Sequence, residues 1–161
     1  YDPHYGIAVA KEIADRLGRI DPDHADDYRS NARAFERRMK KKIEGWERKM
    51  KPHRGKSVVG YHKSLVYLTE WLGLKRAGFI EPQPGISPNP RHLAKLILGM
   101  KQQGVKVVIS EPWYDAETSR TVASRSGAEL VRLPGDVGAG GVDSYEELID
   151  TIINKLAGAF E

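Results

Sequence analysis

The chain contains no cysteine. Disulfide bonds and thiolate metal sites are therefore excluded, and the redox compartment is left open. No apolar run approaches the roughly 20 residues that a membrane-spanning helix needs. No signal peptide is visible either. A mature start or a trimmed chain would look the same, so this absence does not indicate the cytoplasm.

Aromatic residues are missing from the one dense basic run, residues 37–42, within a chain of net charge +4. Such a run can bind nucleic acid or an anionic membrane. Proteins that bind single strands usually interleave aromatic side chains for base stacking. We therefore interpret the run as the solvated face of a long helix and expect no nucleic-acid partner. A basic nucleic-acid interaction module is kept as an alternative.

Two patterns typical of enzymes are also absent. The glycine-rich residues 135–141 lack the lysine and hydroxyl residue of a P-loop and the spacing of a dinucleotide fingerprint. No His-Glu-x-x-His sequence of a zinc hydrolase occurs. The composition is otherwise that of a soluble globular protein, and 161 residues suffice for one domain with a proper core.

The first third of the chain has a helical pattern. A first helix is expected after Pro3-His4, with Gly18 ending it. Asp21-Pro22 then indicates a second start, with aspartate as N-cap and proline at the first helical position. Apolar residues recur from there at spacings of three and four, which predicts a long helix with charged outer faces that ends before Pro52. These apolar residues are Tyr28, Ala32, Phe35, Met39, Ile43, Trp46 and Met50.

The remaining residues alternate between strand-like and helix-like segments. Strands are predicted at residues 57–61, 74–80, 105–109 and 129–133. Helices are predicted around residues 65–72, 90–104 and 116–126 and from residue 145 onward. This alternation predicts an α/β fold, a parallel four-stranded sheet flanked by helices and preceded by the long helix.

One ionisable side chain follows each predicted strand: His62, Glu81, Glu111 and Asp136. Ligands of open parallel sheets bind beyond the carboxyl ends of the strands, so these side chains are candidates for a metal or acid–base site. Each also has a structural interpretation. The histidine can cap the next helix, the two glutamates precede prolines at turns, and the aspartate lies among turn-forming glycines. Three other histidines, on or beside polar helical segments, are expected to be solvated: His24, His53 and His92.

Several motifs in order along the chain resemble those of the zinc and manganese binding proteins of ABC importers. Asp2-Pro3-His4-Tyr5 is similar to the family's Asn-Pro-His-x-Trp segment, and residues 58–63 resemble its strand that ends in Tyr-His. Residues 80–88 are similar to its Glu-Pro-Lys-Pro-Gly-Ile loop. Ser110-Glu111-Pro112 and Asp143-Ser144-Tyr145 also fit.

The resemblance implies two α/β lobes joined by one long helix, with the metal held between them by three histidines and a carboxylate. It implies His4 and His62 as two of the histidines and Asp136 as the carboxylate, with Asp143 as the competing candidate. Histidine at position 62 is the zinc-type version of the site, since imidazole suits zinc and carboxylate suits manganese. Zn²⁺ is therefore the expected ion and Mn²⁺ the alternative.

The chain also departs from the family pattern. Gly6 stands where the family usually has tryptophan, and Ala8-Val9 replaces the Asp-Pro that follows. The amino-terminal lobe is missing. We therefore predict that residues 1–52 hold the start of the cleft motif and the connecting helical segment, and that residues 53–161 form the carboxy-terminal lobe.

The expected function is high-affinity capture of a divalent metal ion in the periplasm, or outside the cytoplasm on a membrane-attached protein, for delivery to an ABC transporter permease. This is a binding function and not catalysis. The surface that meets the missing lobe is expected to be apolar, which invites self-association of this chain. The rival enzyme interpretation is a zinc-dependent hydrolase-like α/β domain with Glu111 or Glu81 as its base.

Overall fold

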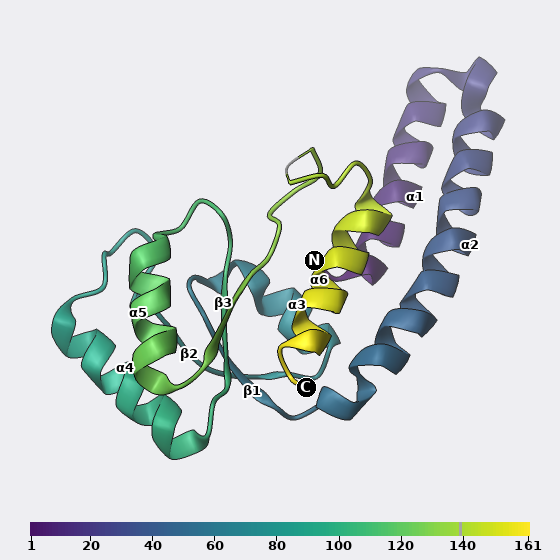
Figure 1. The fold of residues 1–161 in the computed structure, drawn as a ribbon. Coiled ribbons are helices and arrows are strands. Elements are labelled where there is room, and N and C mark those ends of the chain that lie inside the picture. Colours follow the sequence, from purple (N-terminus) through teal and green to yellow (C-terminus); the bar gives the residue numbers. More distant parts are fainter. Residues whose placement is uncertain (139) are drawn as a thin grey trace. The chain divides into compact units, whose positions relative to one another are not determined.

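The structure, a computed structural model, describes residues 1–138 and 140–161. Two compact units make up the chain, Tyr1–Arg48 and Lys49–Glu161, and Figure 1 traces their elements in sequence order. The predicted division into a connecting segment (residues 1–52) and a lobe (residues 53–161) concerns the organisation of the whole protein and stays a prediction.

The first unit is formed by two helices, as the apolar pattern predicts. They are α1 (Pro3–Ile20) and α2 (Ala25–Met50), with the short 3-10 helix η1 (Pro22–His24) between them. The expectation that Gly18 ends α1 is wrong, because the helix continues for two more residues. A Cβ at Gly18 would lie 3.1 Å from the Cβ of Ala25, so this glycine allows the second helix to begin close to the first.

Polar contacts connect the two helices of this unit. The Glu36 carboxylate of α2 accepts a hydrogen bond of 2.9 Å from Lys11 of α1. The proline after Asp21 takes the first position of η1 as predicted, but the aspartate side chain does not cap the helix. Its carboxylate accepts a 2.7 Å hydrogen bond from the hydroxyl of Tyr28 instead.

The second unit contains a four-stranded, entirely parallel sheet, which confirms the predicted fold class. The strands are β1 (Ser57–Gly60), β2 (Lys75–Phe79), β3 (Val107–Ser110) and β4 (Glu129–Arg132), in the order β2-β1-β3-β4. Valines of β1 and β3 are buried on both faces of the sheet, as parallel strands covered on both sides require.

Helices cover the two faces of this sheet (Figure 1). The helical elements of this unit are η2 (Lys51–His53), η3 (Lys63–Leu65), α3 (Val66–Trp71), α4 (Pro90–Gln103), α5 (Ala116–Ser126) and α6 (Tyr145–Gly158). One core cluster joins Val59 and Val108 of the central strands to Met100 of α4 and Val122 of α5. Each aliphatic side chain buried in this way contributes roughly 1.5–3 kcal/mol of transfer free energy.

Short capping motifs fix where the helices of the sheet unit begin and end. The side-chain oxygen of Asn89 accepts a hydrogen bond from the His92 backbone amide at the start of α4. Gly104 ends the same helix with φ 64°, a left-handed conformation that a side chain at this position would disfavour. The Asn89 cap also marks the end of the proline-rich loop that carries Glu81.

Candidate metal centre

Parallel pairing brings the ends of β1 and β2 together at the carboxyl edge of the sheet. The pairing continues past the strands, since the amides of Ile80 and Glu81 donate 2.9 Å hydrogen bonds to the carbonyls of Gly60 and Tyr61. The next residue after Tyr61 is His62, so the histidine and Glu81 are neighbours. The sequence prediction that each of the two residues follows a strand at this edge is confirmed.

The His62 side chain is directed to a carboxylate and not to the following helix. Its backbone is extended at the N-cap of η3, but its side chain makes no capping hydrogen bond, so the capping interpretation is wrong. Ring atom Nδ1 instead contacts the Glu81 carboxylate. The imidazole is 25% exposed and the carboxylate 12% exposed.

Glu81 links this histidine to the proline-rich loop. Its second carboxylate oxygen accepts a 2.7 Å hydrogen bond from the Gly85 amide, so the predicted turn role is confirmed, although it is only half of what the side chain does. The hydrogen bond with His62 lowers the pKa of Glu81, and the Gly85 amide lowers it further. The carboxylate is therefore held in its charged form beside the imidazole.

Glu111 follows β3 and is completely buried. Its Oε1 accepts a hydrogen bond from the Ser64 hydroxyl, while its buried Oε2 has no partner among the described residues. Burial raises the pKa of this carboxyl, although the hydrogen bond from Ser64 and the nearby His62 act in the opposite direction. The turn interpretation of Glu111 therefore misses its principal partner, a side-chain hydroxyl on the loop that begins with His62.

An aromatic cluster adjoins the histidine. The His62 imidazole stacks on the Tyr114 ring at 5.6 Å between centroids, and Tyr61 stacks on the same ring at 4.6 Å. Tyr114 lies in the loop after β3, between Glu111 and the N-terminus of α5. The loops after β1 and β3 therefore meet through their aromatic rings.

The loop after β4 carries both candidate carboxylates. Asp136 is exposed, as is Asp143. The backbone amide of Asp143 donates a 2.8 Å hydrogen bond to the Glu147 carboxylate, in front of α6. Residue 139 of the glycine-rich run lies outside the described residues.

His4 lies in the other unit and is paired in the same way as His62. Asp2 is the N-cap of α1, and one of its carboxylate oxygens accepts a 2.9 Å hydrogen bond from the His4 amide. The same oxygen lies 2.8 Å from His4 Nδ1. Both candidate histidines therefore have a carboxylate at Nδ1, an arrangement that in metal sites fixes the ring and increases the basicity of the ligating nitrogen.

The described residues contain no group of three or more histidine, aspartate or glutamate side chains placed to hold a metal ion. His62 and Glu81 are brought together, whereas His4 belongs to the other compact unit. The ligand set His4, His62 and Asp136 stays a prediction.

Sequence reasoning missed both carboxylate partners. Asp2 was available as a signal, because a residue two positions before a histidine at a helix start can reach its ring. Glu81 required the knowledge that β1 and β2 are adjacent. The first pairing is thus a product of local backbone geometry and the second of strand order, and the residue types alone specified neither.

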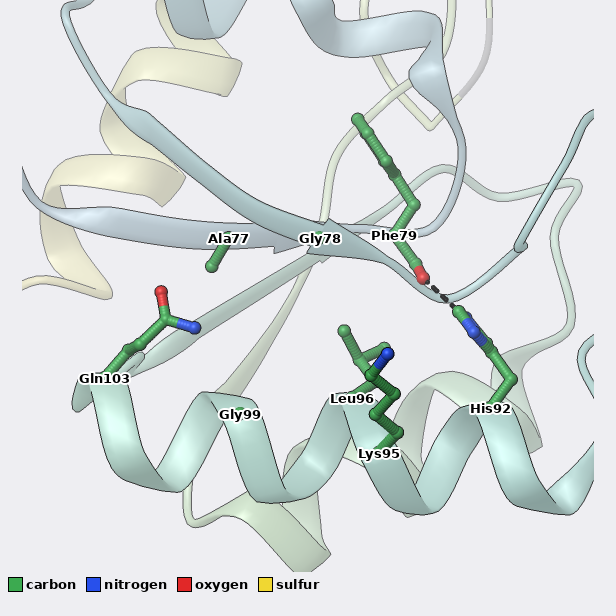
Figure 2. A pocket seen from close by; sticks show the side chains of 8 residues that line it. All are labelled: Ala77, Gly78, Phe79, His92, Lys95, Leu96, Gly99 and Gln103. Carbon is green, nitrogen blue, oxygen red and sulfur yellow. Dashed lines mark hydrogen bonds between the residues drawn. The ribbon is translucent and has the colours of Figure 1, made fainter.

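A separate hollow of about 290 Å³ lies between the edge strand β2 and α4, away from these side chains (Figure 2). Its polar lining includes Lys95 and His92, whose Nε2 lies 3.0 Å from the Phe79 carbonyl oxygen. His92 is thus half-buried, and His53 is buried and stacked on Phe160, so the expectation that these two histidines are solvated is wrong.

No helix among the described residues is long and apolar enough to cross a membrane.

Comparison with known proteins identifies the fold as one lobe of the solute-binding proteins that serve metal import. The laminin binding protein Lmb of Streptococcus agalactiae, described as bifunctional with adhesin and metal transporting activity, superposes with a TM-score of 0.86 at 28% identity, over 99% of this chain and 62% of that chain. FpvC of Pseudomonas aeruginosa, solved in complex with Mn²⁺, has a TM-score of 0.74 at 30% identity over 91% of this chain and 56% of its own.

The family model described as "ZnuA: Zinc-uptake complex component A periplasmic" matches residues 1–159, and the chain belongs to this family. The high-affinity zinc uptake system protein ZnuA of Brucella abortus is 30% identical over 158 residues, which are 96% of this chain and 47% of that protein. The chain therefore spans about half the length of this relative.

Proposed function

We propose that the protein to which this chain belongs captures Zn²⁺ in the periplasm or elsewhere outside the cytoplasm and delivers it to an ABC transporter permease. His4, His62 and Asp136 are the ligands that this chain contributes. The observation that carries the proposal is the shared pairing of both histidines, each with a carboxylate at Nδ1. Ligating histidines almost always donate their other ring N–H to such an acceptor.

The donor set favours zinc over harder ions. Imidazole nitrogen and carboxylate oxygen are typical ligands of four-coordinate Zn²⁺, whereas Mn²⁺ prefers more oxygen ligands. Mn²⁺ remains the alternative ion, since a related structure holds it. Ligation requires neutral imidazoles, so protonation of these side chains should weaken metal binding when the pH is made acidic.

A transport role explains the site better than catalysis does. A catalytic zinc keeps an open position for water and needs a base beside it. Glu111, the strongest candidate for a base, is buried and bonded to Ser64, and Glu81 is engaged by His62 and Gly85. Both carboxylates are therefore occupied in holding loops, and the proposed protein is not an enzyme.

The partner that completes the site is the amino-terminal lobe of the same protein. Large apolar side chains are exposed on the loops that follow β2, β3 and β4, namely Ile86, Trp113 and Val137. They surround the edge that carries the candidate ligands, and such a surface is expected to be covered by another protein segment. In its absence we expect this chain to self-associate at high concentration.

Calorimetric titration of the metal-free chain with Zn²⁺ and Mn²⁺ tests the proposal. Zinc should bind at about one ion per chain and more tightly than manganese, and His4→Ala, His62→Ala and Asp136→Asn should each weaken it. Asp143→Asn distinguishes the two candidate carboxylates. His24→Ala is the matched control, because His24 is an exposed histidine near an aspartate on a helix and is no proposed ligand. Zinc binding that survives all three ligand substitutions would disprove the site.

A further inference from the structure

The loop after β3 connects the two candidate ligands of the sheet unit through aromatic contacts. His62 stacks on Tyr114, and Tyr114 meets the next ring, Trp113, edge to face at 6.1 Å. The Trp113 indole lies directly on Gly135, the residue before Asp136. A continuous series of contacts therefore runs from His62 to the backbone that carries Asp136. We call His62, Tyr114, Trp113 and Gly135 the aromatic bridge.

The contact at Gly135 is unusually close. A Cβ at this position would overlap the Cζ3 and Cη2 atoms of the Trp113 ring, far inside any real carbon–carbon contact. The backbone at Gly135 does not have a positive φ, unlike other glycines of the same loop. Glycine is therefore required here by the space that the indole fills and not by backbone conformation.

Hydrogen bonds to the end of β4 hold the loop that carries Trp113. The carbonyl of Pro112, immediately before it, accepts a 2.8 Å hydrogen bond from the Arg132 guanidinium at the end of β4. The amide of Leu133, which follows Arg132 in the chain, donates a 3.0 Å hydrogen bond to the Ser110 carbonyl. The loops after β3 and β4 are thus joined at their bases, and the indole on Gly135 joins them again further out.

A hydrophobic role alone explains this indole poorly. Trp113 is 56% exposed, so less than half of its surface contributes to burial. An exposed ring of this size that excludes even a methyl group from its neighbour determines where that neighbour lies. This neighbour, Gly135, directly precedes the candidate ligand Asp136. The other end of the aromatic bridge is the candidate ligand His62.

We propose that Trp113 and Gly135 are positioning residues that set the Asp136 loop relative to His62. This inference rests on the proposed function for its consequence, metal affinity, but the positioning itself is a property of the metal-free chain. Substitutions that alter the groups around metal ligands typically lower affinity by about 10- to 100-fold. We expect a loss of that size from Gly135→Ala and from Trp113→Ala.

The experiment is a double-substitution cycle with two readouts. Zinc affinity is measured for the native chain, Gly135→Ala, Trp113→Ala and the double variant, and amide hydrogen exchange of residues 135–138 is measured without metal. Because the methyl group that Gly135→Ala adds conflicts only with the indole, this substitution should cost nothing further once Trp113 is replaced by alanine. Gly158→Ala in α6 is the matched control, since its added Cβ meets nothing within 4 Å.

Faster exchange in both single variants, weaker zinc binding and non-additive losses in the double variant would support the positioning role. Unfolding midpoints close to the native value for Trp113→Ala would show that the loss is not one of global stability. Unchanged exchange of residues 135–138 in Trp113→Ala would overturn the inference even if no variant bound zinc. Native zinc affinity in both single variants would overturn it too, while leaving the proposed function standing. Absence of zinc binding in the native chain would count against the proposed function alone.

Discussion

Glu111 should make the free energy of unfolding depend on pH in a way that Glu111→Gln removes. Its carboxyl is completely buried, and burial raises its pKa above the ordinary value of 4.5. A raised pKa means that the folded chain holds this proton more tightly than the unfolded chain does. The stabilisation is therefore fully present below the unfolded pKa and is lost as the pH rises through the folded pKa.

The magnitude follows from the contacts of this carboxyl. Each unit by which the pKa is raised corresponds to about 1.4 kcal/mol. Oε2 has no partner among the described residues, and an unsatisfied buried polar atom costs about 1–3 kcal/mol. Glutamine keeps an acceptor for Ser64 and loses the charge, while its unpaired amide group adds a cost that does not vary with pH. As the pH rises from 4 to 8, we expect the variant to gain stability relative to the native chain, at up to about 1.4 kcal/mol per pH unit between the unfolded and the folded pKa of Glu111.

Urea unfolding of both chains in the presence of a chelator, at several pH values across this range, measures the difference. His62 is an ionisable side chain that acts on the Glu111 carboxyl, so the comparison is repeated with His62→Ala in both chains. If the difference in unfolding free energy between the native chain and Glu111→Gln stays constant with pH, the reasoning is refuted. A difference that changes sign only when His62 is present would assign the effect to the imidazole.

Three further predictions concern other parts of the chain. Glu36 bonds Lys11 and Lys40, which lower its pKa to about 2. The stabilisation from these ion pairs is thus present above pH 4.5 and is lost as the pH falls through about 2. Glu36→Gln should therefore lower the thermal midpoint at pH 7 but not at pH 2. Equal losses at the two pH values would contradict the role of the ion pairs. Gly45→Ala should raise the unfolding free energy by about 1 kcal/mol, because the added Cβ meets nothing within 4 Å in an exposed helical position. A decrease measured by urea unfolding would show a contact there that the structure lacks. Asn89→Ala should cost about 1 kcal/mol by loss of the α4 cap, and Asn89→Asp should restore it; equal losses in the two variants would contradict the capping role.

The elements of the sheet unit could be predicted closely because their signals are local. The predicted helix at residues 116–126 is α5 with the same bounds, and the prediction of a strand from Glu129 matches β4. Turn-forming glycines and prolines and a change of apolar period mark these segments in the sequence. Gly18 misled because a glycine in a helix can end it or can allow a close neighbour, and only the packing of Ala25 decides between them.

The interior of the candidate site could not be predicted, because its contacts depend on strand order. His62 meets Glu81 only because β2 is the neighbour of β1, and the spacing of the two residues carries no such information. Glu111 is buried and bonded to Ser64 of the segment that follows β1, although its proline neighbour indicated only a turn. The indole of Trp113 on Gly135 is likewise a contact between loops that follow different strands.

X-ray absorption at the zinc edge of the loaded chain tests the central claim most directly, because it reports the atoms bound to the ion. We predict two imidazole ligands together with oxygen ligands from a carboxylate and solvent, with one imidazole lost in His62→Ala and one in His4→Ala. A spectrum without imidazole scattering, or one that neither substitution changes, would contradict the claim that this chain carries half of a zinc-capture site.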